Sequence, residues 1–116
     1  NYDLNDEYFN DKFYLGAIIG RCANRISNST FKLGEKKFRL NENEGKNHLH
    51  GGHNGFHKKN WELVHYDKDR KFVQLSINSI HLESGYPGNL KCEVINLGSN
   101  YIAECIWMVS EQFCKC

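Results

Sequence analysis

Apolar and polar residues alternate along much of the chain, and short polar or glycine-containing segments interrupt the alternation. Residues 31–33 alternate, residues 34–35 (Gly-Glu) break the pattern, and residues 38–40 resume it. Successive side chains of a β-strand point to opposite faces of a sheet, so a period of two indicates half-buried strands. The pattern therefore predicts a short β-hairpin with its turn at residues 34–35.

Longer alternating runs follow in the second half of the chain. They are centred on residues 61–65, 73–77 and 90–94, and a last run extends from 101 to 108. A polar turn is predicted at residues 67–70, between the first two of these runs. No segment carries an apolar stripe of helical period over a useful length. The sequence therefore predicts an all-β sheet protein.

One segment between the predicted strands, residues 41–59, is rich in Asn, Gly and His and shows little periodicity. A loop of this length inside a compact domain is usually functional or disordered. Its four histidines are His48, His50, His53 and His57. This loop is therefore a candidate for the chemistry of the protein.

Spacing alone leaves three interpretations of these histidines open. One is a metal site, because imidazoles are common ligands of zinc, copper and iron, and His48 and His50 would share a face in a strand. The second is an acid–base or hydrogen-bonding histidine, because Gly51 and Gly52 would let a ligand approach the backbone closely. The third is a set of solvated loop histidines. Spacing favours the third and disfavours the metal, since no carboxylate is placed to complete a ligand set.

The segment from Gly20 to Ile26 is a second candidate. A helix would place Arg21 and Arg25 on one face as an anion-binding pair, whereas a strand would place Asn24 on the face opposite to them. Arg and Asn that follow an apolar strand suit sugar recognition, because a guanidinium fork and an amide can both satisfy vicinal hydroxyls. The alternative is two surface arginines and a turn asparagine.

Composition and charge narrow the class of protein. The 116 residues fit one domain at most, and 40% apolar with 25% charged residues is ordinary for a globular chain. The formal net charge is +1, so there is no basic field to hold a phosphate backbone, and we expect no nucleic-acid partner. The longest apolar runs are too short to span a bilayer, so we expect no membrane association.

The chain has five cysteines, an odd and scattered set that makes a poor disulfide framework. We expect reduced thiols, three of them acting as small core residues, and a cytoplasmic location. Cys114 and Cys116 offer two thiolates only, which are too few for a structural zinc site.

Five motifs in register change the interpretation of both candidate segments. Together, in order and spacing, they resemble the opening part of the aldose 1-epimerase (galactose mutarotase) family, over roughly residues 14–97. The motifs are Gly20-Arg21-x-Ala23-Asn24-Arg25-Ile26, Phe31-Lys32-Leu33 with Leu40-Asn41, Asn47-x-Leu49-His50-Gly51-Gly52, Gly55-Phe56 with Trp61, and Gly85-Tyr86-Pro87-Gly88-x-Leu90.

The resemblance implies a fold, an activity and site residues. Members of the family form a large antiparallel β-sandwich and interconvert the α and β anomers of aldoses by acid–base ring opening, without a metal or organic cofactor. It implies that Asn24 and Arg25 bind the substrate, an aldose sugar, and that His50 is a catalytic residue that contacts the sugar near the reacting centre. Phe56 and Tyr86 are expected to shape the loops around the site. The resemblance gives His48, His53 and His57 no function.

Two catalytic elements of the family are missing from this sequence. The segment with the proton-donating histidine and the segment with the catalytic glutamate have no counterpart, and the family pattern is lost in residues 108–116. We therefore expect one partial domain over residues 1–116, inactive or weakly active by itself. The alternatives are a non-catalytic sugar-binding remnant and a metal-binding β-domain built on the histidine loop.

Overall fold

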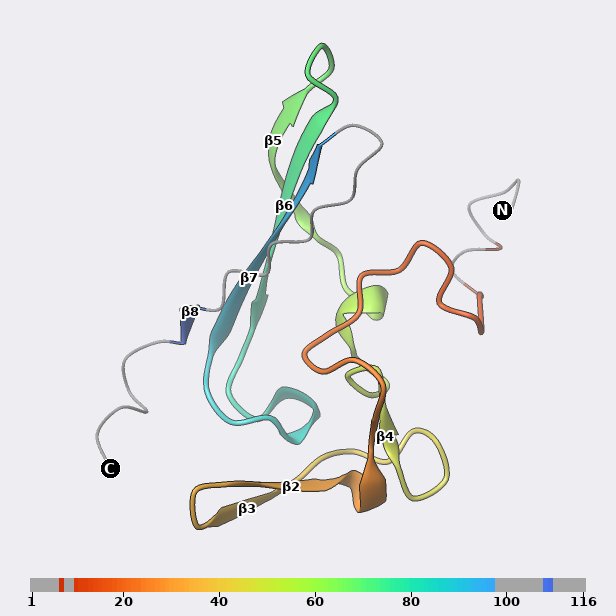
Figure 1. Cartoon of the computed structure of the whole chain (residues 1–116), viewed down its shortest axis with the longest axis vertical. Coiled ribbons are helices and arrows are strands. Elements are labelled where there is room, and N and C mark those ends of the chain that lie inside the picture. Colours follow the sequence, from red (N-terminus) through yellow and green to blue (C-terminus); the bar gives the residue numbers. More distant parts are fainter. Residues whose placement is uncertain (1–6, 8–9, 98–107, 110–116) are drawn as a thin grey trace. The chain divides into compact units, whose positions relative to one another are not determined.

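The computed structural model describes residues 7, 10–97 and 108–109. The chain divides into two compact units, Asn1–Lys59 and Asn60–Cys116 (Figure 1). Every strand pairing among the described residues is antiparallel, and the helical elements within residues 10–97 are three 3-10 turns. The prediction of an all-β fold is therefore confirmed.

The first unit contains the predicted hairpin. Strands β2 (Thr30–Leu33) and β3 (Lys36–Arg39) pair so that Phe31 lies opposite Phe38. The two rings stack with centroids 5.5 Å apart. Gly34 has φ +60 at the first position of the two-residue turn, where hairpin turns of this kind favour glycine. The alternation of the two strands and the glycine of the turn both predicted this hairpin, and the prediction is confirmed.

A second, shorter ladder in this unit was not predicted. Strand β1 (Arg25–Ile26) pairs with β4 (His48–Leu49) and is followed by the 3-10 turn η1 (Ser27–Ser29). Residues 41–59, expected to be an irregular loop, therefore contain β4 and also the 3-10 turn η2 (Phe56–Lys58). A two-residue strand is too short to show a period, so only its pairing reveals it.

The apolar residues before Gly20 were expected to form a strand and do not. Residues 14–20 form a turn around Leu15 and Gly16 followed by irregular chain. Between Gly20 and β1 the chain bends, and Asn24 has φ +64, so neither the helical nor the extended arrangement of Arg21 with Arg25 is present. An apolar run without polar alternation does not by itself distinguish strand from loop.

The second unit is one antiparallel sheet in the order β5-β6-β7-β8. Its strands are β5 (Glu62–Asp67), β6 (Phe72–Ser79), β7 (Leu90–Leu97) and β8 (Met108–Val109). Strands β5, β6 and β7 lie where the alternating runs predicted them, and the predicted polar turn lies between β5 and β6. The 3-10 turn η3 (Glu83–Gly85) leads into Tyr86 and Pro87, which lie outside any strand. Most of the predicted run at residues 101–108 lies outside the described residues.

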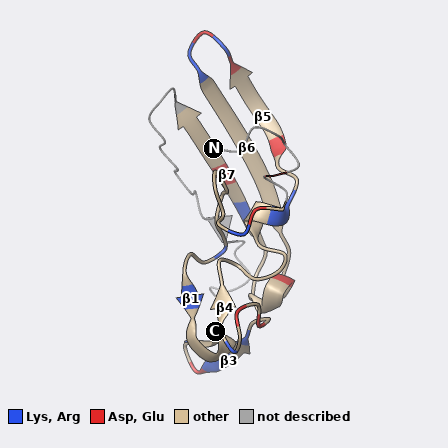
Figure 2. Ribbon diagram, turned by 90° about the vertical axis from the view of Figure 1, so that its right-hand side faces the viewer, with Lys and Arg blue, Asp and Glu red and all other residues tan. Residues whose placement is uncertain are grey.

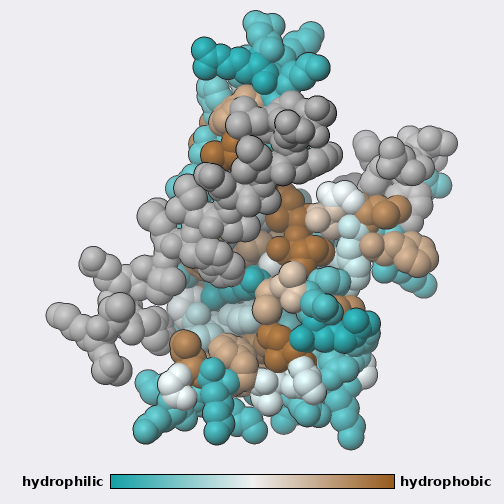
Figure 3. Space-filling model, in the orientation of Figure 1, coloured by the Kyte–Doolittle hydropathy of each residue, from teal (hydrophilic) through white to brown (hydrophobic). Residues whose placement is uncertain are grey.

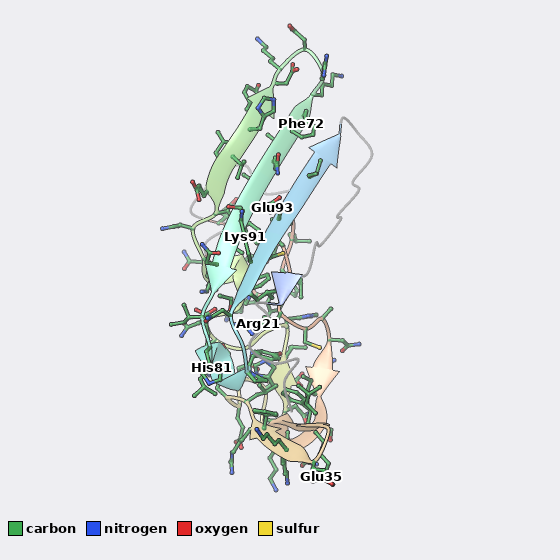
Figure 4. All side chains as sticks on the ribbon, turned by 90° about the vertical axis from the view of Figure 1, so that its left-hand side faces the viewer. Arg21, Glu35, Phe72, His81, Lys91 and Glu93 are labelled. Carbon is green, nitrogen blue, oxygen red and sulfur yellow. The ribbon has the colours of Figure 1, made fainter. Side chains whose placement is uncertain are left out.

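The two faces of this sheet differ in polarity. Ile77 lies opposite Cys92 on one face, whereas Ser76 lies opposite Glu93 on the other. Glu93 binds the ammonium of Lys91 at 2.8 Å (Figure 4) and accepts a hydrogen bond from Gln74 at 3.0 Å. These two bonds, that of Lys91 first, lower the pKa of Glu93.

Charged residues also gather at the turn between β5 and β6 (Figure 2), which forms a hydrophilic end in the space-filling view (Figure 3). On the apolar side, Leu63 and Tyr66 of β5 are 59% and 58% exposed. Within the described residues, no helix is long and apolar enough to cross a bilayer.

Candidate functional site

The structure brings Asn24 and His50 together through two hydrogen bonds. The backbone N–H of Asn24 donates to Nδ1 of His50 at 3.0 Å, and the backbone N–H of His50 donates to the carbonyl of Asn24 at 3.1 Å. Because Nδ1 accepts a hydrogen bond, the neutral imidazole carries its proton on Nε2. His50 therefore presents an N–H donor from a ring whose orientation the backbone fixes.

Asn24 itself occupies the left-handed region, with φ +64, which Asn tolerates better than most residues. Its side-chain oxygen accepts a hydrogen bond from the backbone N–H of Arg25 at 2.9 Å. The oxygen is thus engaged locally, and the Nδ2 amide remains as a donor. Asn24 is exposed, so this donor is accessible to a ligand.

Arg25 forms a side-on ion pair with Glu44. Its Nε donates to both carboxylate oxygens, at 2.9 and 2.7 Å, and its Nη2 donates to Oε1. The hydrogen bonds from Arg25 lower the pKa of Glu44, and the carboxylate in turn raises the pKa of Arg25. Sequence analysis missed Glu44, because nineteen residues separate the partners and no local pattern links them.

A tight turn presents Glu44. Its backbone N–H donates to the carbonyl of Asn47 at 3.1 Å, and the N–H of Asn47 donates back to the carbonyl of Glu44 at 2.9 Å. The side chain of Asn43 fastens this turn to β4, since its Nδ2 donates to the Leu49 carbonyl at 2.9 Å and its Oδ1 accepts from the Leu49 N–H at 2.6 Å. Because β4 also pairs with β1, one ladder positions Arg25, Glu44 and His50.

Glycines allow the backbone segments around His50 to pack at short distance. A Cβ on Gly51 would lie 1.6 Å from the carbonyl oxygen of Gly20, and one on Gly20 would lie 2.2 Å from the ring of Phe56. A Cβ on Gly52 would lie 2.1 Å from the Asn41 amide oxygen. Gly51 and Gly52 thus let other parts of the chain pack closely against this backbone, and the approach of a ligand here stays a prediction.

The remaining loop histidines do not converge on a metal site. His48 is fully buried and its Nδ1 donates to the carbonyl of Asn41 at 2.7 Å, so it is not a solvated loop residue. Burial lowers its pKa. His53 is exposed, and its Nε2 lies 3.0 Å from the carbonyl oxygen of Glu42. Among the described residues, no group of three or more His, Cys, Asp or Glu side chains could hold a metal ion.

Tyr14, which sequence analysis did not single out, lies against two of the histidines. Its ring contacts those of His50 and His57 edge-on, with centroids 4.7 and 4.9 Å away. Burial, followed by the charge of Lys58, lowers the pKa of His57. Phe56 is buried against Gly20, and Tyr86 is buried in the second unit, so a role of either ring in shaping a sugar site stays a prediction.

Comparisons with known proteins give one consistent result. The family model described as aldose 1-epimerase matches residues 1–97. The aldose 1-epimerase of Haemophilus influenzae is 40% identical over 89 residues, which are 77% of this chain and 25% of that protein. The galactose mutarotase of Homo sapiens is 42% identical over 84 residues, which are 72% of this chain and 24% of that protein.

Solved structures agree with the sequence relatives. An aldose epimerase homologue from C. elegans matches with a TM-score of 0.76 and 34% identity, over 84% of this chain and 29% of that one. A galactose 1-epimerase from Lactobacillus acidophilus matches with a TM-score of 0.69 and 30% identity, over 80% and 28% of the two chains. The chain spans about a quarter of the length of the curated relatives it matches.

Proposed function

Because the chain belongs to the aldose 1-epimerase family, we propose that it carries the Asn24, Arg25 and His50 part of an aldose-binding site. The family resemblance seen in the sequence motifs is thereby confirmed. The observation that carries the proposal is the hydrogen-bonded pair of Asn24 and His50 beside Arg25, inside the region that matches relatives named for this activity. The activity is that of an isomerase acting on α and β anomers of aldoses such as galactose and glucose.

The geometry supports defined roles for these residues. The Nε2–H of His50 can donate to a sugar oxygen near the reacting centre, because Nδ1 is held as an acceptor. Asn24 Nδ2 and the free guanidinium N–H groups of Arg25 can donate to neighbouring hydroxyls. Anomer exchange needs a base to take the proton of the anomeric hydroxyl and an acid to protonate the ring oxygen. The proposal requires no cofactor and assigns the protein to the cytoplasm.

For this chain by itself we propose weak sugar binding and negligible mutarotase activity. Each positioned acid or base contributes about 10²–10⁴ in rate, and the family's second histidine and glutamate have no counterpart in this sequence. A non-catalytic sugar-binding protein is the second candidate. The metal-binding alternative has no support among the described residues.

One pair of measurements tests the proposal. Galactose is titrated into the isotope-labelled chain and binding is followed by NMR, while polarimetry follows the mutarotation of α-galactose with and without the chain. We expect millimolar binding that His50→Ala removes and His53→Ala, a change in the same loop, leaves intact. Mutarotation should proceed at the rate of buffer alone. Absence of galactose binding would refute the proposed site, and rapid mutarotation abolished by His50→Ala would refute the lack of activity.

A further inference from the structure

The ion pair between Arg25 and Glu44 occupies only one edge of the guanidinium. A guanidinium has five N–H donors, and Glu44 takes those of Nε and one of Nη2. Within the described part of the chain, Nη1 has no hydrogen-bond partner. The edge formed by Nη1 and the second Nη2 donor therefore remains for a ligand, and its direction is set by the edge that Glu44 holds.

The carboxylate is itself held in place. Glu44 is tied by two backbone hydrogen bonds to Asn47, with lengths of 3.1 and 2.9 Å, and the same turn is fastened to β4 by the side chain of Asn43. The next residue after β4 is His50. A carboxylate on such a turn restricts the rotamers of Arg25, a side chain that would otherwise lose much conformational entropy on binding a ligand.

We propose that Glu44 is a positioning residue, which orients the guanidinium of Arg25 so that its free edge faces the aldose bound beside His50. The proposal rests on the proposed function, because it assigns Arg25 the aldose as ligand. It adds a residue that the sequence motifs did not include. Glu44 need not touch the sugar, since its effect passes through Arg25.

A purely structural role for the pair is the alternative, and exposure argues against it. The side chains of Arg25 and Glu44 are 55% and 35% exposed, and ion pairs in such surroundings contribute little to stability. A matched control is the pair of Arg39, at the end of β3, and Glu42 of the same loop, which pair at 2.8 Å and are 77% and 40% exposed. Loss of either ion pair should therefore leave the unfolding transition nearly unchanged. Only loss of the Arg25–Glu44 pair should weaken sugar binding.

The experiment compares Glu44→Gln with Glu42→Gln in the full chain, using two NMR readouts and one stability readout. The Nε–H signal of Arg25 reports the ion pair, and galactose titration reports the ligand. We expect Glu44→Gln to shift this signal and speed its exchange with water, and to weaken galactose binding about three- to tenfold. Glu42→Gln should do neither. Urea unfolding midpoints should agree among the three proteins.

The outcomes separate the two proposals. If wild-type chain shows no response to galactose, the proposed function fails and the role of Glu44 falls with it. If wild type binds galactose but Glu44→Gln binds as Glu42→Gln does, the positioning role alone is refuted. An unchanged Nε–H signal in Glu44→Gln refutes it too, as does tighter binding, which would mean that Glu44 competes with the sugar for Arg25.

Discussion

The hydrogen bond that orients the ring of His50 comes from the main chain of Asn24 and not from another side chain. Both hydrogen bonds between the two residues use the backbone of Asn24, at 3.0 and 3.1 Å. A carboxylate in this place would favour the charged imidazolium, whereas a peptide N–H fixes only the tautomer and the ring direction. The Leu-His-Gly-Gly motif named the histidine, but its spacing could not reveal that Asn24, twenty-six residues away, directs the ring.

Buried His48 makes the stability of the first unit depend on pH. Burial lowers the pKa of His48, so the unfolded chain takes up this proton at a higher pH than the folded chain does. Stability is therefore fully present above the ordinary histidine pKa of about 6.5 and falls as pH decreases toward the lowered value. His57, whose pKa is lowered by burial and then by Lys58, contributes with the same sign.

Urea unfolding at pH 7.5 and pH 5.5 should accordingly give a lower free energy of unfolding at the acidic pH. His48→Asn removes the titrating group and keeps an N–H donor for the Asn41 carbonyl, so it should reduce the difference between the two pH values. A pH difference unaffected by His48→Asn would show that His48 is not its source.

Replacing Gly51 with alanine should lower the free energy of unfolding more than replacing Gly45 with alanine. Both have positive φ, +87 and +57, so an alanine is strained at either position. At Gly51 the new Cβ would also lie 1.6 Å from the Gly20 carbonyl oxygen, whereas at Gly45 nothing lies within 4 Å. Gly45→Ala should therefore cost about 1 kcal/mol, and Gly51→Ala more than about 3 kcal/mol. Chemical denaturation measures both, and equal costs would contradict the close approach of Gly51 and Gly20.

At the scale of elements, the sequence predicted the strands within residues 10–97 wherever a period had room to appear. Residues 73–78 of β6 alternate between apolar and polar over six positions, and their period was visible before any pairing was known. Strands β1 and β4 have two residues each, so no period could mark them, and they form through pairing between distant segments. The site depends on this second ladder, which explains why the motifs named Arg25 and His50 but not the contact that unites them.

The turn that carries Glu44 should depend on the amide of Asn43. Asn43→Asp keeps an acceptor for the Leu49 N–H but replaces the donor to the Leu49 carbonyl with a second acceptor. We expect a loss of about 1–3 kcal/mol in the free energy of unfolding and faster amide exchange at Leu49. Asn54→Asp makes the same charge change at an exposed position of the loop and should have little effect. Equal losses in both variants would contradict the proposed anchoring.

At the scale of the whole molecule, the apolar–polar period and the motifs predicted the fold class and the family but not the inner contacts of the site. Glu44 is nineteen residues from Arg25, and Tyr14 is thirty-six residues from His50. Neither pair has a local sequence signal, because chain folding alone brings them together. Family motifs carry information about such contacts only for residues that the motifs contain, and Glu44 and Tyr14 are in none of them.

The second unit should associate with itself through the apolar side of β5. Leu63 and Tyr66 are more than half exposed there, lie opposite Leu75 and Val73 of β6, and belong to an outer strand of the described sheet. Outer strands with exposed apolar side chains favour association between chains. In sedimentation velocity, the sedimentation coefficient should increase with protein concentration. The double substitution of Leu63→Lys and Tyr66→Lys should reduce this increase. His65→Lys, paired with Gln74 on the polar side of the same strand, is the control, because an equal reduction there would assign the effect to charge and not to the apolar side.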